Sequence, residues 1–262
     1  MFRYLRIYKK LLGLNFANVT AYRANFVNSI IASVGWGFIS LYSIYLLTNN
    51  INTAYGWSRQ EILLFNGLYG MIIGVFHMLI SVNMRRFSRV IHLGDLDLIL
   101  TKPIDSQFAL SFWLVDFTII LRILMAGCYT LWFINILGIA VTFVQMLSVI
   151  TIAFFSLVLL YSLWYSTLSV LIWDSSLSNL VLLLYSFESF ARFPREVAQQ
   201  LINVLFFILL PITLIINTPA HILMGKFTWV EIIRLLVLST FFFYLSRRIW
   251  RFALRYYASA SS

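Results

Sequence analysis

Long stretches of this chain contain no Asp, Glu, Lys or Arg. Three of the longest are residues 24–58, 62–84 and 123–173. A helix of about 20 apolar residues is long enough to cross the hydrocarbon core of a bilayer. The third stretch is too long for one crossing, and Asn135 and Gly138 mark the expected break between two helices. These uncharged runs constrain the fold more than any other feature, and they predict an all-α polytopic membrane protein.

The composition excludes most other classes of protein. Of the 262 residues, 61% are hydrophobic and 11% are charged, whereas a soluble domain carries roughly 25% charged residues. This argues against a soluble enzyme, a disordered chain and a nucleic-acid-binding domain, despite the net charge of +10. The lone Cys128 cannot form an internal disulfide or supply a cysteine-based metal site. No metal site is expected.

The apolar runs predict six transmembrane helices. The first five are expected within 26–48, 62–84, 112–137, 142–172 and the shorter run 177–190, and the sixth within 230–246. The membrane domain then covers 26–246. Between the fifth and sixth helices, the proline-interrupted segment 190–225 predicts an outer re-entrant helical hairpin, since irregular backbone is tolerated in a membrane only under a protein or water cover. In the alternative, 198–217 is a full crossing and the count is seven.

Basic residues set the expected orientation. Thirteen of the 19 Lys and Arg residues fall within 1–25, 85–102 and 247–255. An even number of crossings puts all three clusters on one side, and the positive-inside rule makes that side cytoplasmic. Both termini are therefore expected in the cytoplasm. Residues 1–25 predict an interfacial helix on anionic membrane lipid, and 247–262 a basic cytoplasmic tail.

Charges inside the membrane are candidates for function, and they are few. Asp116 and Arg122 lie near the expected start of the third helix, and Glu188 and Arg192 have the four-residue spacing of a helical salt bridge at the outer interface. The expected helices contain no series of acidic residues that could relay protons across the membrane. The hydrolase, zinc and P-loop motifs are absent, so an ATP-driven transporter built on this chain needs an ATPase from another polypeptide.

The loop 85–105 is the one long loop expected in the cytoplasm. Asp95 and Asp97 are a weak signal for a metal or acid–base pair, because no histidine motif accompanies them. The loop is either a solvated connection or a short amphipathic element that docks on a soluble partner. In the second case Leu96, Leu98 and Leu100 would make the apolar contacts, and Pro103 would end the element.

The segment from Gly94 to Pro103 reads Gly-Asp-Leu-Asp-Leu-Ile-Leu-Thr-Lys-Pro. It resembles a pattern between the second and third helices of permease subunits of type-2 ABC exporters, in which Arg is common where Lys102 stands. The segment Phe-Pro-Arg-Glu at 193–196, followed by Pro211, by Thr-Pro-Ala at 218–220 and by Leu-Met-Gly at 223–225, is similar to that family as well. With the six-helix layout, the resemblance covers nearly the whole chain.

The resemblance implies roles for particular residues. Those of the coupling loop that would contact the ATPase are Arg85, Arg86, Arg89, Gly94, Asp95, Leu96, Asp97, Leu98, Leu100, Thr101, Lys102 and Pro103. An elbow helix beside the same ATPase would carry Arg3, Arg6, Lys9 and Lys10, and the outer re-entrant element would include Glu188, Arg192, Pro194, Pro211 and Pro219. Two permease chains, identical or related, would face each other, with the first, second and fifth helices lining a central cleft.

The expected function is that of the permease subunit of an ATP-driven exporter in the bacterial cytoplasmic membrane. Two ATPase subunits per complex would bind ATP and Mg²⁺, and this chain would bind no cofactor and catalyse no reaction. The many Phe and Tyr residues suit a hydrophobic or amphipathic substrate. The alternatives are an ion-coupled transporter, a membrane-embedded enzyme that modifies lipid, and an anchoring subunit that moves nothing. Transport by an ion-coupled transporter would stop when the ion gradient collapses. A lipid-modifying enzyme would turn over its substrate as a single purified chain.

Overall fold

The computed structural model describes residues 2–50, 52–54, 56–174, 177, 179–196 and 206–257. Within these, the only strands form a small hairpin of β1 (Thr53–Ala54) and β2 (Trp57–Ser58). The long helices are α1 (Phe2–Ala21), α2 (Arg23–Leu47), α3 (Arg59–Phe76), α4 (Val82–His92), α7 (Ile120–Ile136), α8 (Phe143–Leu168), α11 (Phe206–Leu223) and α12 (Trp229–Ala253). Shorter helices are α5 (Leu96–Leu100), α6 (Ser106–Ser111) and α9 (Leu180–Ser189), the π-helical turn η1 (His77–Ser81), and the 3₁₀ turns η2 (Phe117–Ile119), η3 (Ser169–Ile172) and η4 (Phe190–Arg192).

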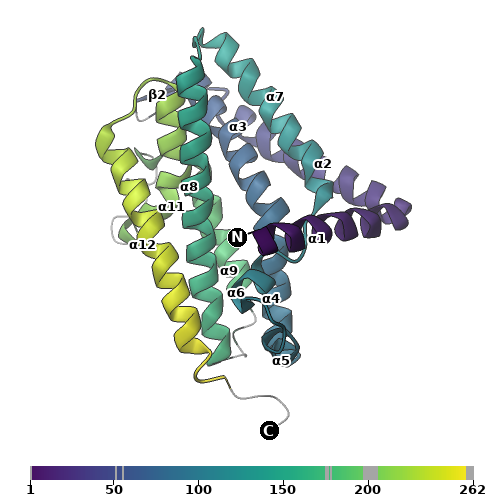
Figure 1. Cartoon of the computed structure of the whole chain (residues 1–262). Coiled ribbons are helices and arrows are strands. Elements are labelled where there is room, and N and C mark those ends of the chain that lie inside the picture. The colour runs from purple at the N-terminus through teal and green to yellow at the C-terminus, as the bar shows by residue number, and fades with distance from the viewer. Residues whose placement is uncertain are drawn as a thin grey trace.

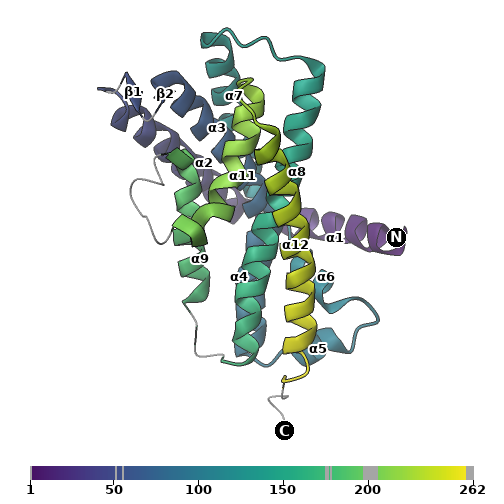
Figure 2. The ribbon, with the colours of Figure 1, turned by 90° about the vertical axis from the view of Figure 1, so that its left-hand side faces the viewer.

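The long helices form two packed groups. Helix α8 packs against α11 and α12, and α7 packs against α2 and α3 (Figure 1). The β hairpin and the turn between α7 and α8 lie at one end of the molecule, and α5 and the last turn of α12 lie at the other. Helix α1 lies across the long helices in both views (Figure 2). This is the orientation expected of a helix in the membrane interface.

Within the part of the chain that the structure describes, five stretches are long and apolar enough to cross a membrane. They are Arg23–Leu47, Arg59–His92, Phe117–Ile136, Phe143–Ile172 and Trp229–Ala253. The chain is therefore an all-α, multi-pass membrane protein, as the uncharged runs predict. Helix α9 has only 10 residues. The Pro211–Leu223 part of α11 is also shorter than the five long spans. The sixth crossing and the re-entrant hairpin stay predictions, and residues 197–205 of that hairpin lie outside the described part of the chain.

The break in the longest uncharged run is confirmed. Helix α7 ends at Ile136, and Gly138 follows with a φ of 63°, a left-handed conformation that glycine adopts without steric penalty. Helix α8 then begins with a capping box, in which the Thr142 hydroxyl and the Gln145 side chain each accept from the other residue's backbone amide. Local residues thus define both sides of this turn.

The third span begins at Phe117, not at Phe112 as the sequence predicted. Residues 112–116 are not helical, because side chains of other helices form hydrogen bonds with their backbone groups. The Asn83 amide donates to the Leu114 carbonyl (2.8 Å) and accepts from the Leu114 amide (2.8 Å), and Asn15 donates to the Trp113 carbonyl (2.9 Å). The Asp116 amide donates to the Met78 carbonyl in the π turn (2.9 Å).

Helix α11 runs through both of its prolines without a break, so the expectation that Pro211 and Pro219 interrupt this run is wrong. A proline removes the hydrogen bond to the carbonyl four residues earlier, which for Pro219 is that of Ile215. The buried Ser156 hydroxyl on α8 donates to this carbonyl at 2.8 Å. A neighbouring helix therefore supplies the donor that the proline lacks.

We expect Ser156→Ala to destabilise the protein by about 1–3 kcal/mol, because it leaves the buried Ile215 carbonyl without a donor. The thermal unfolding of the full chain in mild detergent measures this. The loss should be smaller in a Pro219→Ala background, where the alanine brings back an N–H donor. Ser148→Ala on the same helix is the matched control, since Ser148 is half-buried and its hydroxyl donates to the Val144 carbonyl of its own helix. An equal cost in both backgrounds would contradict the assignment.

The last helix extends further than its apolar pattern indicated. Helix α12 continues past Ser246 to Ala253. Arg247, Arg248 and Arg251 therefore lie on a helix, and the described part of the tail begins after Ala253. Arg247 also pairs with Asp105 within the fold.

Candidate functional site

The loop between the second and third spans is mostly helical. Helix α4 continues to His92, a turn containing Gly94 follows, and α5 begins after Asp95. Within α5, Leu96 is fully buried and Ile99 is 4% exposed, whereas Leu98 is 66% exposed. Leu93 in the turn and Leu100 are exposed as well. Leu96 and Ile99 anchor the element, and Leu93, Leu98 and Leu100 are available to a partner.

The assignment of Leu96 as a partner contact is therefore wrong. Leu96, Leu98 and Leu100 would share one surface only in an extended segment. In a helix, residues two apart point about 200° away from each other. Leu96 accordingly faces the interior and Leu98 faces outward.

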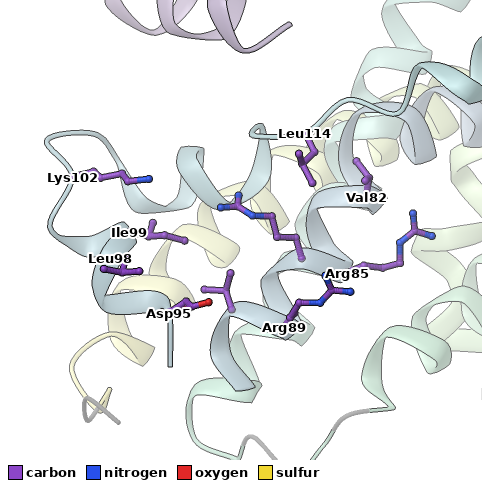
Figure 3. A pocket seen from close by; sticks show the side chains of 10 residues that line it. Val82, Arg85, Arg89, Asp95, Leu98, Ile99, Lys102 and Leu114 are labelled. Carbon is purple, nitrogen blue, oxygen red and sulfur yellow. The ribbon is translucent and has the colours of Figure 1, made fainter. Parts of the chain in front are cut away.

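A cavity of about 500 Å³ lies between α4 and the segment around α5. Figure 3 shows Val82, Arg85 and Arg89 on α4, with Asp95, Leu98, Ile99 and Lys102 across from them. Arg86, Val90 and Leu114 complete the lining. The lining thus carries the cations Arg85, Arg86, Arg89 and Lys102 but a single acid, Asp95. This cationic cavity is suited to acidic groups.

Two of these cations lie against the ring of Trp113. The Lys102 ammonium lies 4.3 Å from its ring centroid, and the Arg86 guanidinium lies 5.2 Å from it. Both distances suit cation–π interactions. One terminal nitrogen of Arg86, Nη1, is buried without a hydrogen-bond acceptor among the described residues. The cavity therefore contains a donor with unused capacity.

The residues that follow α5 are hydrogen-bonded to the last helix, α12. The Arg247 guanidinium forms a two-bond pair with the Asp105 carboxylate, donating from Nη1 to Oδ1 at 2.8 Å and from Nη2 to Oδ2. Arg247 also donates to Gln107 (3.0 Å), and the Trp250 indole donates to the Ser106 hydroxyl (3.1 Å). A displacement of the loop would therefore reach α12 through α6.

Asp105 stays ionised at neutral pH. Burial by itself would raise the pKa of its carboxyl, but the hydrogen bonds from Arg247 and from the Phe108 amide outweigh that effect and hold the pKa below its ordinary value. A carboxyl whose pKa is lowered by folding stabilises the fold at pH values above its ordinary pKa. This contribution is lost as the pH falls through the lowered pKa. The Asp105–Arg247 ion pair, which joins α6 to α12, is thus formed at neutral pH.

Helix α1 lies beside the same region. The Arg3 guanidinium donates to the Pro103 carbonyl (2.7 Å), and the Tyr4 hydroxyl accepts from the Asp105 amide (3.2 Å). Ring contacts pair Tyr4 with Phe108 and Tyr8 with Phe112. The predicted elbow cations Arg3, Arg6, Lys9 and Lys10 are exposed. The structure therefore brings the predicted elbow and the predicted coupling loop together.

The residues predicted for the outer element do not pair as expected. The interpretation of Glu188 and Arg192 as a helical salt bridge is wrong, since Glu188 is 3% exposed and its Oε1 lies 2.8 Å from His77 Nε2. Arg192 instead lies over the Tyr69 ring, 5.6 Å from its centroid. Pro194 follows η4, and Pro211 and Pro219 lie within α11.

The polar side of the π turn has no signal in the sequence. His77 and Ser81 both lie in η1, and both contact α9: His77 contacts Glu188, and the Ser81 hydroxyl lies 2.5 Å from that of Tyr185. Arg85 donates to the same Tyr185 hydroxyl at 3.3 Å. A π turn within an α-helix frequently marks a functional site. Among the described residues, no group of three or more His, Cys, Asp or Glu is arranged to hold a metal ion.

The fold and this loop define a multi-pass membrane protein with a structured element at one end. Comparison with protein families identifies the family: residues 34–261 match the model described as ABC-2 family transporter protein. The chain belongs to this family, and it is a permease subunit of the ABC transporter class. Comparisons with curated proteins and with solved structures gave no match.

Proposed function

We propose that this chain is the permease of an ATP-driven exporter and that it binds a separate ATPase through the surface around α5. The observation that carries the proposal is the split of α5 into buried anchors, Leu96 and Ile99, and the exposed Leu98. A short helix held this way presents apolar side chains without needing a partner to fold. The cationic cavity beside it adds Arg86 and Lys102, which would attract acidic groups of the ATPase.

Energy from the ATPase would reach the membrane helices by two routes. One runs from α5 through α6 to α12, along the Asp105–Arg247 pair. The other runs from α5 back along α4 into the π turn. In this proposal two permease chains and two ATPases form the complex, both termini of this chain lie in the cytoplasm of a bacterium, and ATP and Mg²⁺ bind to the ATPase alone.

Purification of the full chain from its native membrane in mild detergent tests the proposal. We expect a P-loop ATPase to copurify in near-equal amount, with either one or two kinds of permease present. Leu98→Glu should reduce the recovered ATPase by about tenfold or more, because it places a charge at the centre of an apolar contact.

Leu98→Met is the matched control, since methionine keeps the apolar contact at similar volume and should retain the ATPase. Recovery of the wild-type chain alone, folded and in good yield, would overturn the proposal in favour of an ion-coupled transporter or a lipid-modifying enzyme. Normal ATPase recovery with Leu98→Glu would show that the ATPase docks elsewhere.

A further inference from the structure

A second cavity, of about 600 Å³, lies among the membrane helices. Helix α2, the π turn, the start of α4, residues 116–122 and Tyr185 of α9 surround it. The polar residues of its lining are Asn25, Ser29, Ser33, His77, Ser81, Arg85, Asp116, Thr118, Arg122 and Tyr185, and the apolar ones are Ala32, Trp36 and Ile119. We call it the membrane cavity. Helices of four predicted crossings enclose it, since α9 lies within the predicted crossing 177–190.

Two hydrogen-bonding groups of this cavity have no partner in the described part of the chain. They are Nε of Arg122 and the hydroxyl of Ser33, and both atoms are buried. Arginine can only donate. A buried donor without an acceptor costs free energy comparable to a lost hydrogen bond. The arrangement is therefore suited to a ligand that brings acceptor oxygens.

The one acidic residue in the lining is already engaged. Asp116 Oδ1 accepts from the Thr118 amide (3.1 Å) and from its hydroxyl (2.5 Å). Among the lining residues Arg85 and Arg122 thus outnumber the single acid, and Glu188 behind the lining is paired with His77. The charge and the unused donors both favour an anion.

Helix α2 is shaped to admit the Arg122 side chain. Ser29, Ser33 and Gly37 are spaced four residues apart and so share one face of this helix. A Cβ at Gly37 would lie 2.8 Å from Arg122 Cγ and 2.7 Å from the Met125 methyl group. The absence of a side chain at Gly37 therefore lets Arg122 lie against α2, one turn from Ser33.

The cavity is amphipathic along its length. Asn25 and Arg122 lie near the starts of their apolar spans, Arg23–Leu47 and Phe117–Ile136, and Arg85 lies near the end of the span Arg59–His92. Asn25 and Arg85 therefore lie at one edge of the apolar region, and the Arg122 side chain reaches from there to Gly37, near the middle of α2. Trp36 and Ala32 extend the same wall toward the middle of α2. An anionic head on an apolar tail matches this arrangement.

We propose that the membrane cavity binds the headgroup of an anionic amphiphile, a phosphate or carboxylate attached to an apolar chain. Arg122 holds the headgroup, Ser33 and Arg85 add donors, and the chain lies along Trp36. This rests on the proposed function, because it names the class of substrate that the permease would move. Arg85 lines this cavity as well as the cationic cavity at α5, so the two sites share a side chain.

Binding of tritiated dodecyl phosphate to the purified full chain in neutral detergent tests this inference in a scintillation proximity assay. Arg122→Gln should weaken binding by about tenfold or more, because it removes a charge-assisted donor. Arg122→Lys should lose less than Arg122→Gln, because it keeps the positive charge. Gly37→Ala, which displaces Arg122 without removing its charge, should also weaken binding. Arg234→Gln, an exposed arginine on α12, is the matched control and should bind as the wild type does.

Competitors identify the ligand class. Unlabelled dodecyl phosphate should displace the probe, whereas inorganic phosphate and dodecyltrimethylammonium should fail at the same concentration. Competition by inorganic phosphate would overturn the amphiphile in favour of a free anion, and competition by the ammonium would overturn the anionic headgroup. Arg122→Gln that elutes as a folded protein and binds like Arg234→Gln would overturn the site. The assay contains no ATPase, so its failure is distinct from failure of the copurification test.

Discussion

Replacing His77 with leucine is expected to destabilise the protein by about 3 kcal/mol or more. His77 Nε2 lies 2.8 Å from Glu188 Oε1, and Glu188 is 3% exposed. The other carboxylate oxygen of Glu188 is buried with no hydrogen-bond partner among the described residues. The variant would leave the buried carboxyl without this bond, and breaking a buried pair on one side typically costs about 3–5 kcal/mol. Arg122, close enough to interact electrostatically with Glu188, would offset part of the loss.

Thermal unfolding of the full chain and the yield of folded protein measure this effect. His92→Leu is the matched control, because His92 is exposed on α4 and makes no such pair. The double variant His77→Leu with Glu188→Leu should recover much of the stability, since two apolar side chains then replace the pair. The pairing would be refuted by a His77→Leu variant as stable as His92→Leu.

The sequence predicted the membrane architecture well because charge is so costly in a bilayer. The apolar runs located every described stretch that is long enough to cross, and the Asn135–Gly138 region correctly divided the longest run. Both signals are local in the sequence. A reader of the sequence needs only the thickness of the bilayer and the conformational preference of glycine to use them.

The errors arose where a distant residue decides the local structure. Pro219 suggested a broken helix, but Ser156, far away on α8, bonds the carbonyl that the proline leaves free. Glu188 has Arg192 four residues away, yet its partner is His77 on another helix. The sequence contains no pattern that connects such residues, so a chain without aligned relatives does not reveal these pairs.

The short element within the 85–105 loop was predicted in its place, but the directions of its side chains were not. A run of five residues is too short to separate a helical period from an alternating one. Leu96, Leu98 and Leu100 were therefore grouped together, although only Leu96 and Ile99 face the interior. The membrane cavity was also missed, because its lining comes from five segments and none of them forms a motif alone.

Asn83→Leu is expected to cost about 3 kcal/mol or more and to disturb both cavities. The Asn83 side chain is fully buried and forms hydrogen bonds with both the amide and the carbonyl of Leu114, each at 2.8 Å. Leucine is similar in size but leaves two backbone groups unsatisfied, at about 1–3 kcal/mol each. Leu114 lines the cationic cavity and Asp116 lines the membrane cavity. The segment that Asn83 holds therefore separates the two sites.

Thermal unfolding ranks this variant against a close analogue. Asn15 donates to the Trp113 carbonyl at 2.9 Å, but its other bond returns to Leu11 in its own helix. Asn15→Leu removes one contact to the segment where Asn83→Leu removes two, so it should cost less. The folded fraction of Asn83→Leu should also bind both the ATPase and dodecyl phosphate more weakly. If both variants unfold at the same temperature, contacts other than Asn83 hold residues 112–116, and the two cavities are not joined through this side chain.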